Sequence, residues 1–302
     1  DCYENIKRYI DYVDRTSPSG LTSWGRGDWV PVKSHSSKEL TSSVYFYVDT
    51  KILANAAKLF NKQEDYKHYQ ALAEKIRQAI NDKYLNRETG IYASGVQTEL
   101  SVPLMWGIVP KDMKAKVARN LAKKVEEAGF HLDVGVLGAK AILNALSENG
   151  EAETAYKVAA QDTYPSWGCW IANGATTLLE NWDLNATRDI SDNHMMFGEI
   201  GGWFYKGLGG IFPDPENPGF KHILLRPNFP SGLNEFEARY QSPYGEICSK
   251  WERKKNRIVY HVTVPANSTA TFYAPDNVKG ERAVNLEAGK HILELPIKRA
   301  VY

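Results

Sequence analysis

Long apolar runs are missing from this 302-residue sequence, and their absence excludes membrane-spanning helices. No hydrophobic stretch approaches the roughly 18 uninterrupted apolar residues that such a helix needs. Cysteine is also scarce. Cys2, Cys169 and Cys248 are too few and too scattered for a disulfide framework, and they lack the close spacing of a zinc site. We interpret all three as small apolar residues.

An excess of charge of one sign is absent as well. The chain has 37 Lys and Arg against 36 Asp and Glu, a formal net charge of +1. No global field therefore favours nucleic acid or an anionic membrane as a partner. The seven histidines lack metal-type spacing, and there is no phosphate-binding glycine loop or Ser-His-Asp elbow. We expect a neutral substrate, with no cofactor and no metal.

The chain starts abruptly at Asp1, and this start suggests a piece of a longer protein. There is no initiator methionine, and residues 3–13 already have the apolar spacing of an amphipathic helix. We expect helices that belong to the same domain to precede this segment.

The first two-thirds of the sequence has helical periodicity. One apolar stripe lies in residues 66–81, at Tyr69, Leu72, Ala73, Ile76 and Ile80. Similar stripes occupy residues 40–60, 113–125, 136–146 and 200–208. Loops rich in Gly, Trp and acidic residues separate them. This pattern predicts an (α/α)₆ toroid of antiparallel helices, incomplete on its N-terminal side, whose loops line one mouth.

The character of the sequence changes after Phe212. Prolines become frequent, and residues 222–225, 257–264 and 268–273 are β-branched and aromatic. We therefore predict two domains: a helical catalytic domain in residues 1–212 and an all-β sandwich in residues 213–302.

Six of the eight tryptophans form three clusters that suggest a carbohydrate cleft. The clusters are Trp24 with Trp29, Trp167 with Trp170, and Trp182 with Trp203. Sugar rings stack on indole faces, and their hydroxyl groups need charged or amide partners. The alternative is that these rings belong to the hydrophobic core.

Three further residues could serve such a cleft. Hydrolysis of a glycosidic bond needs two carboxyl groups. Glu180 follows an apolar run that we interpret as helical and precedes Trp182, so we expect it to be partly desolvated. Asp28 lies between Gly27 and Trp29, where substrate contact and helix capping are equally open. His194 follows Glu180 by fourteen residues.

Together these motifs resemble those of the family 78 α-L-rhamnosidases, in the order and at spacings typical of that family. The motifs are Gly-Asp-Trp at 27–29, Lys-Glu-Leu-Thr at 38–41, Tyr-Phe-Tyr at 45–47, His-Leu-Asp-Val-Gly at 131–135, Leu-Gly at 137–138, Tyr-Pro-Ser-Trp-Gly at 164–168, Gly-Ala-Thr-Thr at 174–177 with Glu180 and Trp182, Asn-His at 193–194, and Tyr-Gln-Ser-Pro-Tyr-Gly at 240–245. The resemblance covers nearly the whole chain.

The resemblance implies a secreted bacterial enzyme that releases terminal α-L-rhamnose with inversion of configuration. Glu180 resembles the general base that activates water, and His194 resembles a rhamnose-binding histidine. Three more residues lie in loops that correspond to the sugar pocket of the family, Asp28, Trp29 and Trp167, with Trp24 as a further candidate. We expect a periplasmic or extracellular location, because the family degrades external glycans.

Two departures from the family pattern bear on activity. Asn181 stands where the family commonly has arginine, and the general-acid motif, Asp-Glu-Arg followed by Gly-Trp, is absent. In the family that motif precedes Gly-Asp-Trp, so we expect it upstream of these residues and the isolated chain to be nearly inactive. Two alternatives are a non-catalytic carbohydrate-binding or scaffold protein of the same fold, and another helical-toroid glycosidase, such as a glucoamylase-like or trehalase-like enzyme.

Overall fold

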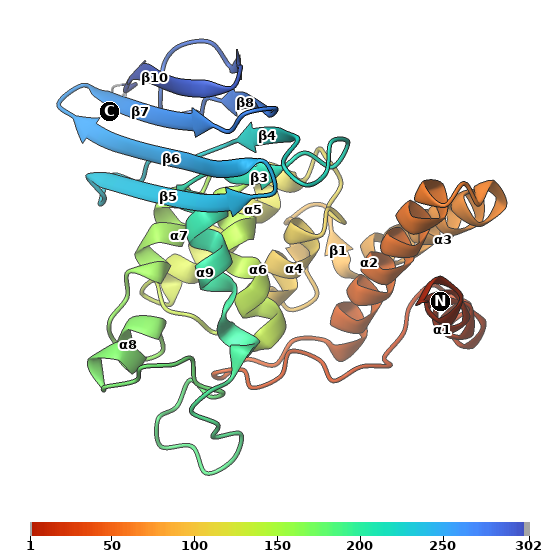
Figure 1. The fold of residues 1–302 in the computed structure, drawn as a ribbon. Coiled ribbons are helices and arrows are strands. Elements are labelled where there is room, and N and C mark those ends of the chain that lie inside the picture. Colours follow the sequence, from red (N-terminus) through yellow and green to blue (C-terminus); the bar gives the residue numbers. More distant parts are fainter. Residues whose placement is uncertain (1, 299–302) are drawn as a thin grey trace.

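A helical part and a β-sandwich make up the computed structural model, which describes residues 2–298 (Figure 1). The α-helices are α1 (Cys2–Thr16), α2 (Lys38–Leu59), α3 (Gln63–Tyr84), α4 (Gln97–Met105), α5 (Lys114–Glu127), α6 (Val136–Ser147), α7 (Ala152–Ala159), α8 (Trp167–Ala172) and α9 (Glu199–Trp203). A 3₁₀ turn, η1 (Met195–Phe197), precedes α9, and a π-helix, η2 (Phe204–Leu208), follows it.

The predicted helical stripes match observed helices. The stripe in residues 66–81 lies on α3, and all five of its apolar residues are buried. Helix α2 begins after Ser37, whose hydroxyl group accepts a hydrogen bond from the Leu40 N–H at 3.2 Å. The chain then turns within three residues into α3, and Figure 1 shows the two helices as an antiparallel hairpin.

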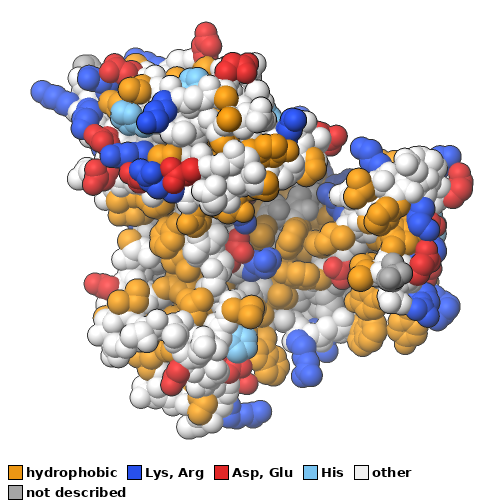
Figure 2. Space-filling model, in the orientation of Figure 1, with side chains coloured by type: hydrophobic (Ala, Val, Ile, Leu, Met, Phe, Trp, Pro, Cys, Tyr) orange, Lys and Arg blue, Asp and Glu red, His pale blue; other side chains and the backbone are white. Residues whose placement is uncertain are grey.

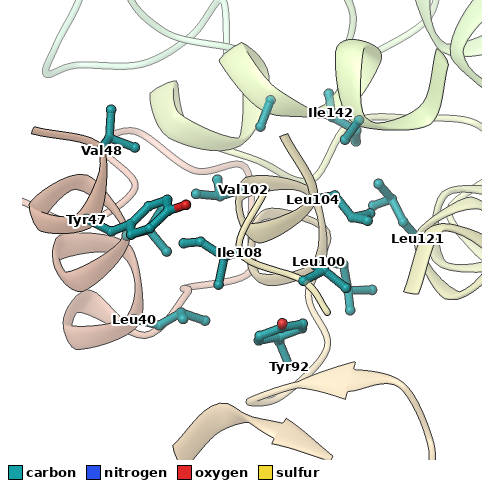
Figure 3. Close-up of a cluster of buried hydrophobic side chains, with 14 of the residues drawn as sticks. Leu40, Tyr47, Val48, Tyr92, Leu100, Val102, Leu104, Ile108, Leu121 and Ile142 are labelled. Atoms are coloured by element: carbon teal, nitrogen blue, oxygen red, sulfur yellow. The ribbon is translucent and has the colours of Figure 1, made fainter. Parts of the chain in front are cut away.

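A continuous hydrophobic core joins the helices of this part of the chain. Figure 3 shows side chains from α2, α4 and α6 converging between these helices, with Val48, Val102 and Ile142 among them. The helices therefore share one core rather than packing as separate pairs. None of the helices in residues 2–298 is both long enough and apolar enough to cross a membrane.

The strands are short and mostly antiparallel. They are β1 (Leu85–Asn86), β2 (Ile91–Tyr92), β3 (Ile211–Pro213), β4 (His222–Leu225), β5 (Glu235–Ser242), β6 (Gly245–Lys254), β7 (Arg257–Val264), β8 (Thr269–Tyr273), β9 (Ala283–Leu286) and β10 (Gly289–Pro296). β1 and β2 form a small ribbon within the helical part.

Two four-stranded sheets form the sandwich, in the orders β10-β7-β6-β5 and β3-β4-β8-β9. The pairing of β4 with β8 is parallel, and the other pairings are antiparallel. Along β7, residues alternate between the core and the outside, as expected for a half-buried strand. The core between the sheets contains Trp251, Tyr260 and Phe272.

The sandwich packs directly on the end of the helical part. The Trp251 indole N–H donates to the Leu208 carbonyl oxygen at 3.1 Å, and Leu233 and Phe236 contact both cores. Figure 2 shows the surface hollowed between this sandwich-bearing part of the molecule and the α2–α3 hairpin.

Candidate active site

A cleft of about 570 Å³ opens between α1, α2, the loop at residues 22–29, the start of α6 and the loop that carries Glu180. Its aromatic and charged lining residues are Tyr9, Trp24, Arg26, Trp29, Tyr45, Phe46, Asp49, Glu180 and Asp189. Three predicted site residues thus line one cleft, Trp24, Trp29 and Glu180, although they come from segments more than 150 residues apart in the sequence.

Trp24 and Trp29 expose indole surface at this cleft. Trp24 is 60% exposed and Trp29 is 40% exposed. Tyr9 and Tyr12 of α1 pack beside Trp24, with ring centroids 5.9 and 5.6 Å away. Trp24 keeps more than half of its surface exposed beside these contacts, and stacking on the apolar face of a sugar requires accessible ring surface of this kind.

The Glu180 side chain is half-buried and lines the cleft. One of its carboxylate oxygens accepts a hydrogen bond from the Ser191 N–H at 3.1 Å, and its own N–H donates to the Ser191 carbonyl oxygen at 2.9 Å. This pairing fixes the backbone of Glu180 and leaves its second carboxylate oxygen without a protein partner among residues 2–298.

The expectation of a helix leading to Glu180 was wrong. Helix α8 ends at Ala172, and Gly174 follows with φ of 88°. Only glycine adopts this left-handed conformation readily, and it turns the chain away from the helix axis. Residues 178–180 form no helix, and backbone hydrogen bonds hold them to the segment 191–194 instead.

Asp28 does not line the cleft. Its carboxylate is buried and accepts hydrogen bonds from the backbone N–H groups of Gly135, Leu137 and Gly138, at 2.7 to 3.1 Å, and from the Thr98 hydroxyl group. Burial raises the pKa of Asp28, and these four hydrogen bonds oppose the rise. The observed contacts match helix capping, so substrate contact by Asp28 stays a prediction that the geometry does not favour.

Trp167 also lies away from the cleft, in the core. Its indole N–H donates to the Phe197 carbonyl oxygen at 3.0 Å, and its ring packs edge-on against Trp182. Trp170 stacks on Trp182 with ring centroids 4.8 Å apart. The core alternative therefore describes this group of rings, and a sugar contact by Trp167 stays an untested prediction.

His194 is hydrogen-bonded to the segment that leads to Glu180 but does not line the cleft. Its backbone N–H donates to the Leu178 carbonyl oxygen at 2.9 Å, and its imidazole Nδ1 accepts from the Met196 backbone N–H at 3.2 Å. The imidazole thereby caps η1. Nε2 has no partner among residues 2–298, so it is the ring atom that remains for a ligand.

Two cleft residues of α2 escaped prediction. Tyr45 and Asp49 lie four residues apart, so they share one face of the helix. The apolar stripe in residues 40–60 predicted only the side of α2 that faces the core, because apolar periodicity identifies buried helix faces. A polar residue one turn after the Tyr-Phe-Tyr motif was the signal available.

Comparisons with known proteins identify alpha-L-rhamnosidases as relatives of this chain. Residues 1–208 match a family model described as the bacterial alpha-L-rhamnosidase 6 hairpin glycosidase domain, and residues 210–289 match the bacterial alpha-L-rhamnosidase C-terminal domain. An alpha-L-rhamnosidase of Formosa agariphila is 29% identical over 299 residues, which cover 94% of this chain and 32% of that protein.

Solved structures give the same result. An alpha-L-rhamnosidase from Dictyoglumus thermophilum superposes with a TM-score of 0.88 at 32% identity, over 97% of this chain and 36% of that one. The Streptomyces avermitilis alpha-L-rhamnosidase complexed with L-rhamnose superposes with a TM-score of 0.84 at 27% identity, over 98% of this chain and 30% of that one. These matches confirm the predicted fold class, a six-hairpin helical domain followed by a β-sandwich. The chain spans about a third of the length of these relatives.

Proposed function

We propose a function from one premise: this chain belongs to the bacterial α-L-rhamnosidase family. In this proposal the full-length protein hydrolyses glycosides that end in α-L-rhamnose. The observation that carries the proposal is the cleft that Glu180, Trp24 and Trp29 line together. It combines exposed indole surface with a half-buried carboxylate, the two features that a sugar-cleaving site needs.

In this proposal the reaction inverts the configuration of the anomeric carbon. Glu180 acts as the general base: its free carboxylate oxygen takes a proton from a water molecule, and that water attacks the anomeric carbon. A second carboxyl group protonates the departing glycosidic oxygen from the opposite side. The hydrogen bond from the Ser191 N–H to Glu180 supports this role, because it orients the carboxylate without occupying both oxygens.

We place the proton donor in a part of the parent protein outside these 302 residues. The chain lacks the general-acid motif of the family and covers about a third of its relatives. The isolated chain is then nearly inactive, since loss of general-acid assistance lowers the rate by roughly 10²- to 10⁴-fold. We also propose that the protein works in the periplasm or outside the cell, which cell fractionation tests.

Replacing Glu180 by Gln in the full-length protein tests the assignment. We expect kcat on an aryl α-L-rhamnoside to fall by at least about 10²-fold, with the melting temperature unchanged. The matched control is Glu88→Gln, which changes an exposed glutamate of the helical part. Unchanged turnover in Glu180→Gln excludes the role. Proton NMR of the first product reports the mechanism: β-L-rhamnose supports inversion, and α-L-rhamnose contradicts it.

A non-catalytic carbohydrate-binding protein of the same fold is the second candidate. One observation favours it, the absence of the acid motif from these residues. A full-length protein that binds L-rhamnose but hydrolyses no rhamnoside would establish the non-catalytic function. A screen of aryl glycosides separates both candidates from a helical-toroid glycosidase of other specificity.

A further inference from the structure

We propose that Asp49 is a second acidic residue of the carbohydrate site and accepts a hydrogen bond from a hydroxyl group of the terminal sugar. This inference rests on the proposed function, because it adds a substrate contact within the same cleft. Asp49 lies midway along α2 and lines the cleft together with Glu180 and Trp24.

The Asp49 carboxylate has no protein partner. It is half-buried, and burial raises its pKa, with no hydrogen bond or ion pair from residues 2–298 to lower it. Two other half-buried acids of the helical part differ in this respect. Asp133 accepts hydrogen bonds from Ser34, and Glu199 accepts one from Lys206. A carboxylate removed from bulk water is normally paired in this way, so Asp49 is free for a ligand.

The groups around Asp49 suit a sugar. Tyr9 lines the same cleft as Asp49, and burial together with the Asp49 charge raises the pKa of its phenol. Tyr45 lies one turn earlier on the same face of α2 and also lines the cleft, and burial is the main cause that raises its pKa. An acidic acceptor beside aromatic rings offers a sugar both a hydrogen-bond partner and an apolar surface.

The surroundings of Asp49 that the structure describes do not form a metal site, and they suit a polyhydroxyl ligand. Within residues 2–298 no group of three His, Cys, Asp or Glu side chains could hold a metal ion. A carboxylate acts only as an acceptor, and each sugar hydroxyl group supplies a donor. Asp49 therefore contributes to binding and orientation of the sugar, and transfers no proton in the reaction.

The test compares Asp49→Asn with the wild type in the full-length protein. KM for an aryl α-L-rhamnoside and the inhibition constant of free L-rhamnose should both rise roughly ten-fold or more, because a hydrogen bond to a charged acceptor is lost. The melting temperature and kcat should change little. Asp14→Asn is the matched control. It changes a half-buried aspartate of α1 that pairs with Lys75 at 3.5 Å and does not line the cleft.

Three outcomes would overturn the inference. Unchanged KM and an unchanged inhibition constant exclude a sugar contact. A lower melting temperature without a change in KM assigns Asp49 to an ion pair with the rest of the protein. A fall in kcat confined to poor leaving groups makes Asp49 the proton donor.

If the wild type hydrolyses no rhamnoside, calorimetry with L-rhamnose decides. Weaker binding of L-rhamnose by Asp49→Asn supports the inference, and absence of binding by the wild type refutes both proposals.

Discussion

The carboxylate of Asp28 accepts a hydrogen bond from the backbone N–H of Gly135 at 2.8 Å. This bond joins the loop at residues 22–29, the tryptophan loop, to the start of α6. Leu137 and Gly138 donate to the other carboxylate oxygen. The first N–H groups of a helix have no partner within the helix, so a carboxylate from a distant segment satisfies them and matches the helix dipole. Trp29, the next residue, is held at the cleft by this arrangement.

We predict that Asp28→Ala destabilises the protein by roughly 2 to 4 kcal/mol, because several buried N–H groups and the Thr98 hydroxyl group lose their acceptor. Thermal or chemical denaturation of the full-length protein measures the loss. Asp82→Ala, at an exposed aspartate of α3, is the control and should change stability little. A stable Asp28→Ala protein with a raised KM would instead reveal the substrate contact that the sequence left open.

A second prediction concerns Gly135, where the tryptophan loop approaches the helix most closely. A Cβ atom at Gly135 would lie 2.3 Å from the Trp29 carbonyl oxygen, which also accepts the Val136 N–H. Gly135→Ala must therefore push the loop away. We expect a clear drop in melting temperature and a higher KM.

Gly201→Ala is the matched control for Gly135→Ala. Gly201 lies in α9, and a Cβ atom there would meet nothing within 4 Å. Alanine is favoured over glycine in a helix, so this variant should be neutral or more stable by up to about 1 kcal/mol. Equal melting temperatures for the two variants would show that the loop tolerates displacement from α6.

The tryptophans should separate into two classes. Trp24→Ala removes an exposed ring from the cleft, so KM should rise roughly ten-fold while the melting temperature stays within a few degrees. Trp167→Ala removes a buried ring and its hydrogen bond to Phe197, and should destabilise the protein by roughly 3 to 5 kcal/mol. Enzyme kinetics and denaturation on the same samples distinguish the two. A KM effect of the conservative Trp167→Phe without loss of stability would return Trp167 to the site.

Much of the fold could be predicted from the sequence because apolar periodicity records burial. The stripe at residues 136–146 is α6, and the β-branched run at 257–264 is β7. The helix expected before Glu180 failed for a local reason: Gly174 adopts a left-handed conformation, and no periodicity reveals this. The apolar run after Gly174 therefore forms an irregular segment and no helix.

The candidate site was only partly accessible from the sequence. A cluster of tryptophans looks the same in the sequence whether it lines a cleft or fills a core. Only the exposed fraction of each ring in the folded protein shows that Trp24 lies at the surface and Trp167 in the core. Asp28 has the same ambiguity, since its partners lie more than 100 residues away at Gly135 and Leu137. Asp49 was missed because a polar residue on a helix is normally solvated.

The final prediction concerns the pH dependence of stability through Glu199, which links α9, α6 and η2. Lys206 and Asn144 each donate a hydrogen bond to its carboxylate at 3.0 Å, and the Lys140 ammonium group lies 3.6 Å away. Burial alone would raise the pKa of Glu199, but these partners hold it below its ordinary value. The carboxylate is therefore more stable in the folded than in the unfolded protein.

The sign of the effect follows from this lowered pKa. The stabilisation is fully present above the pKa of an unfolded glutamate, about 4.3, and is lost as pH falls through the lower folded value. At pH 7 Glu199→Gln should be less stable than the wild type by about 1 kcal/mol, a figure reduced for solvent screening. Below about pH 4 the difference should shrink, because both proteins then lack the charge. Denaturation of both proteins at pH 7, 5 and 3.5 measures this, and a difference that stays constant with pH would show that packing, not charge, gives Glu199 its role.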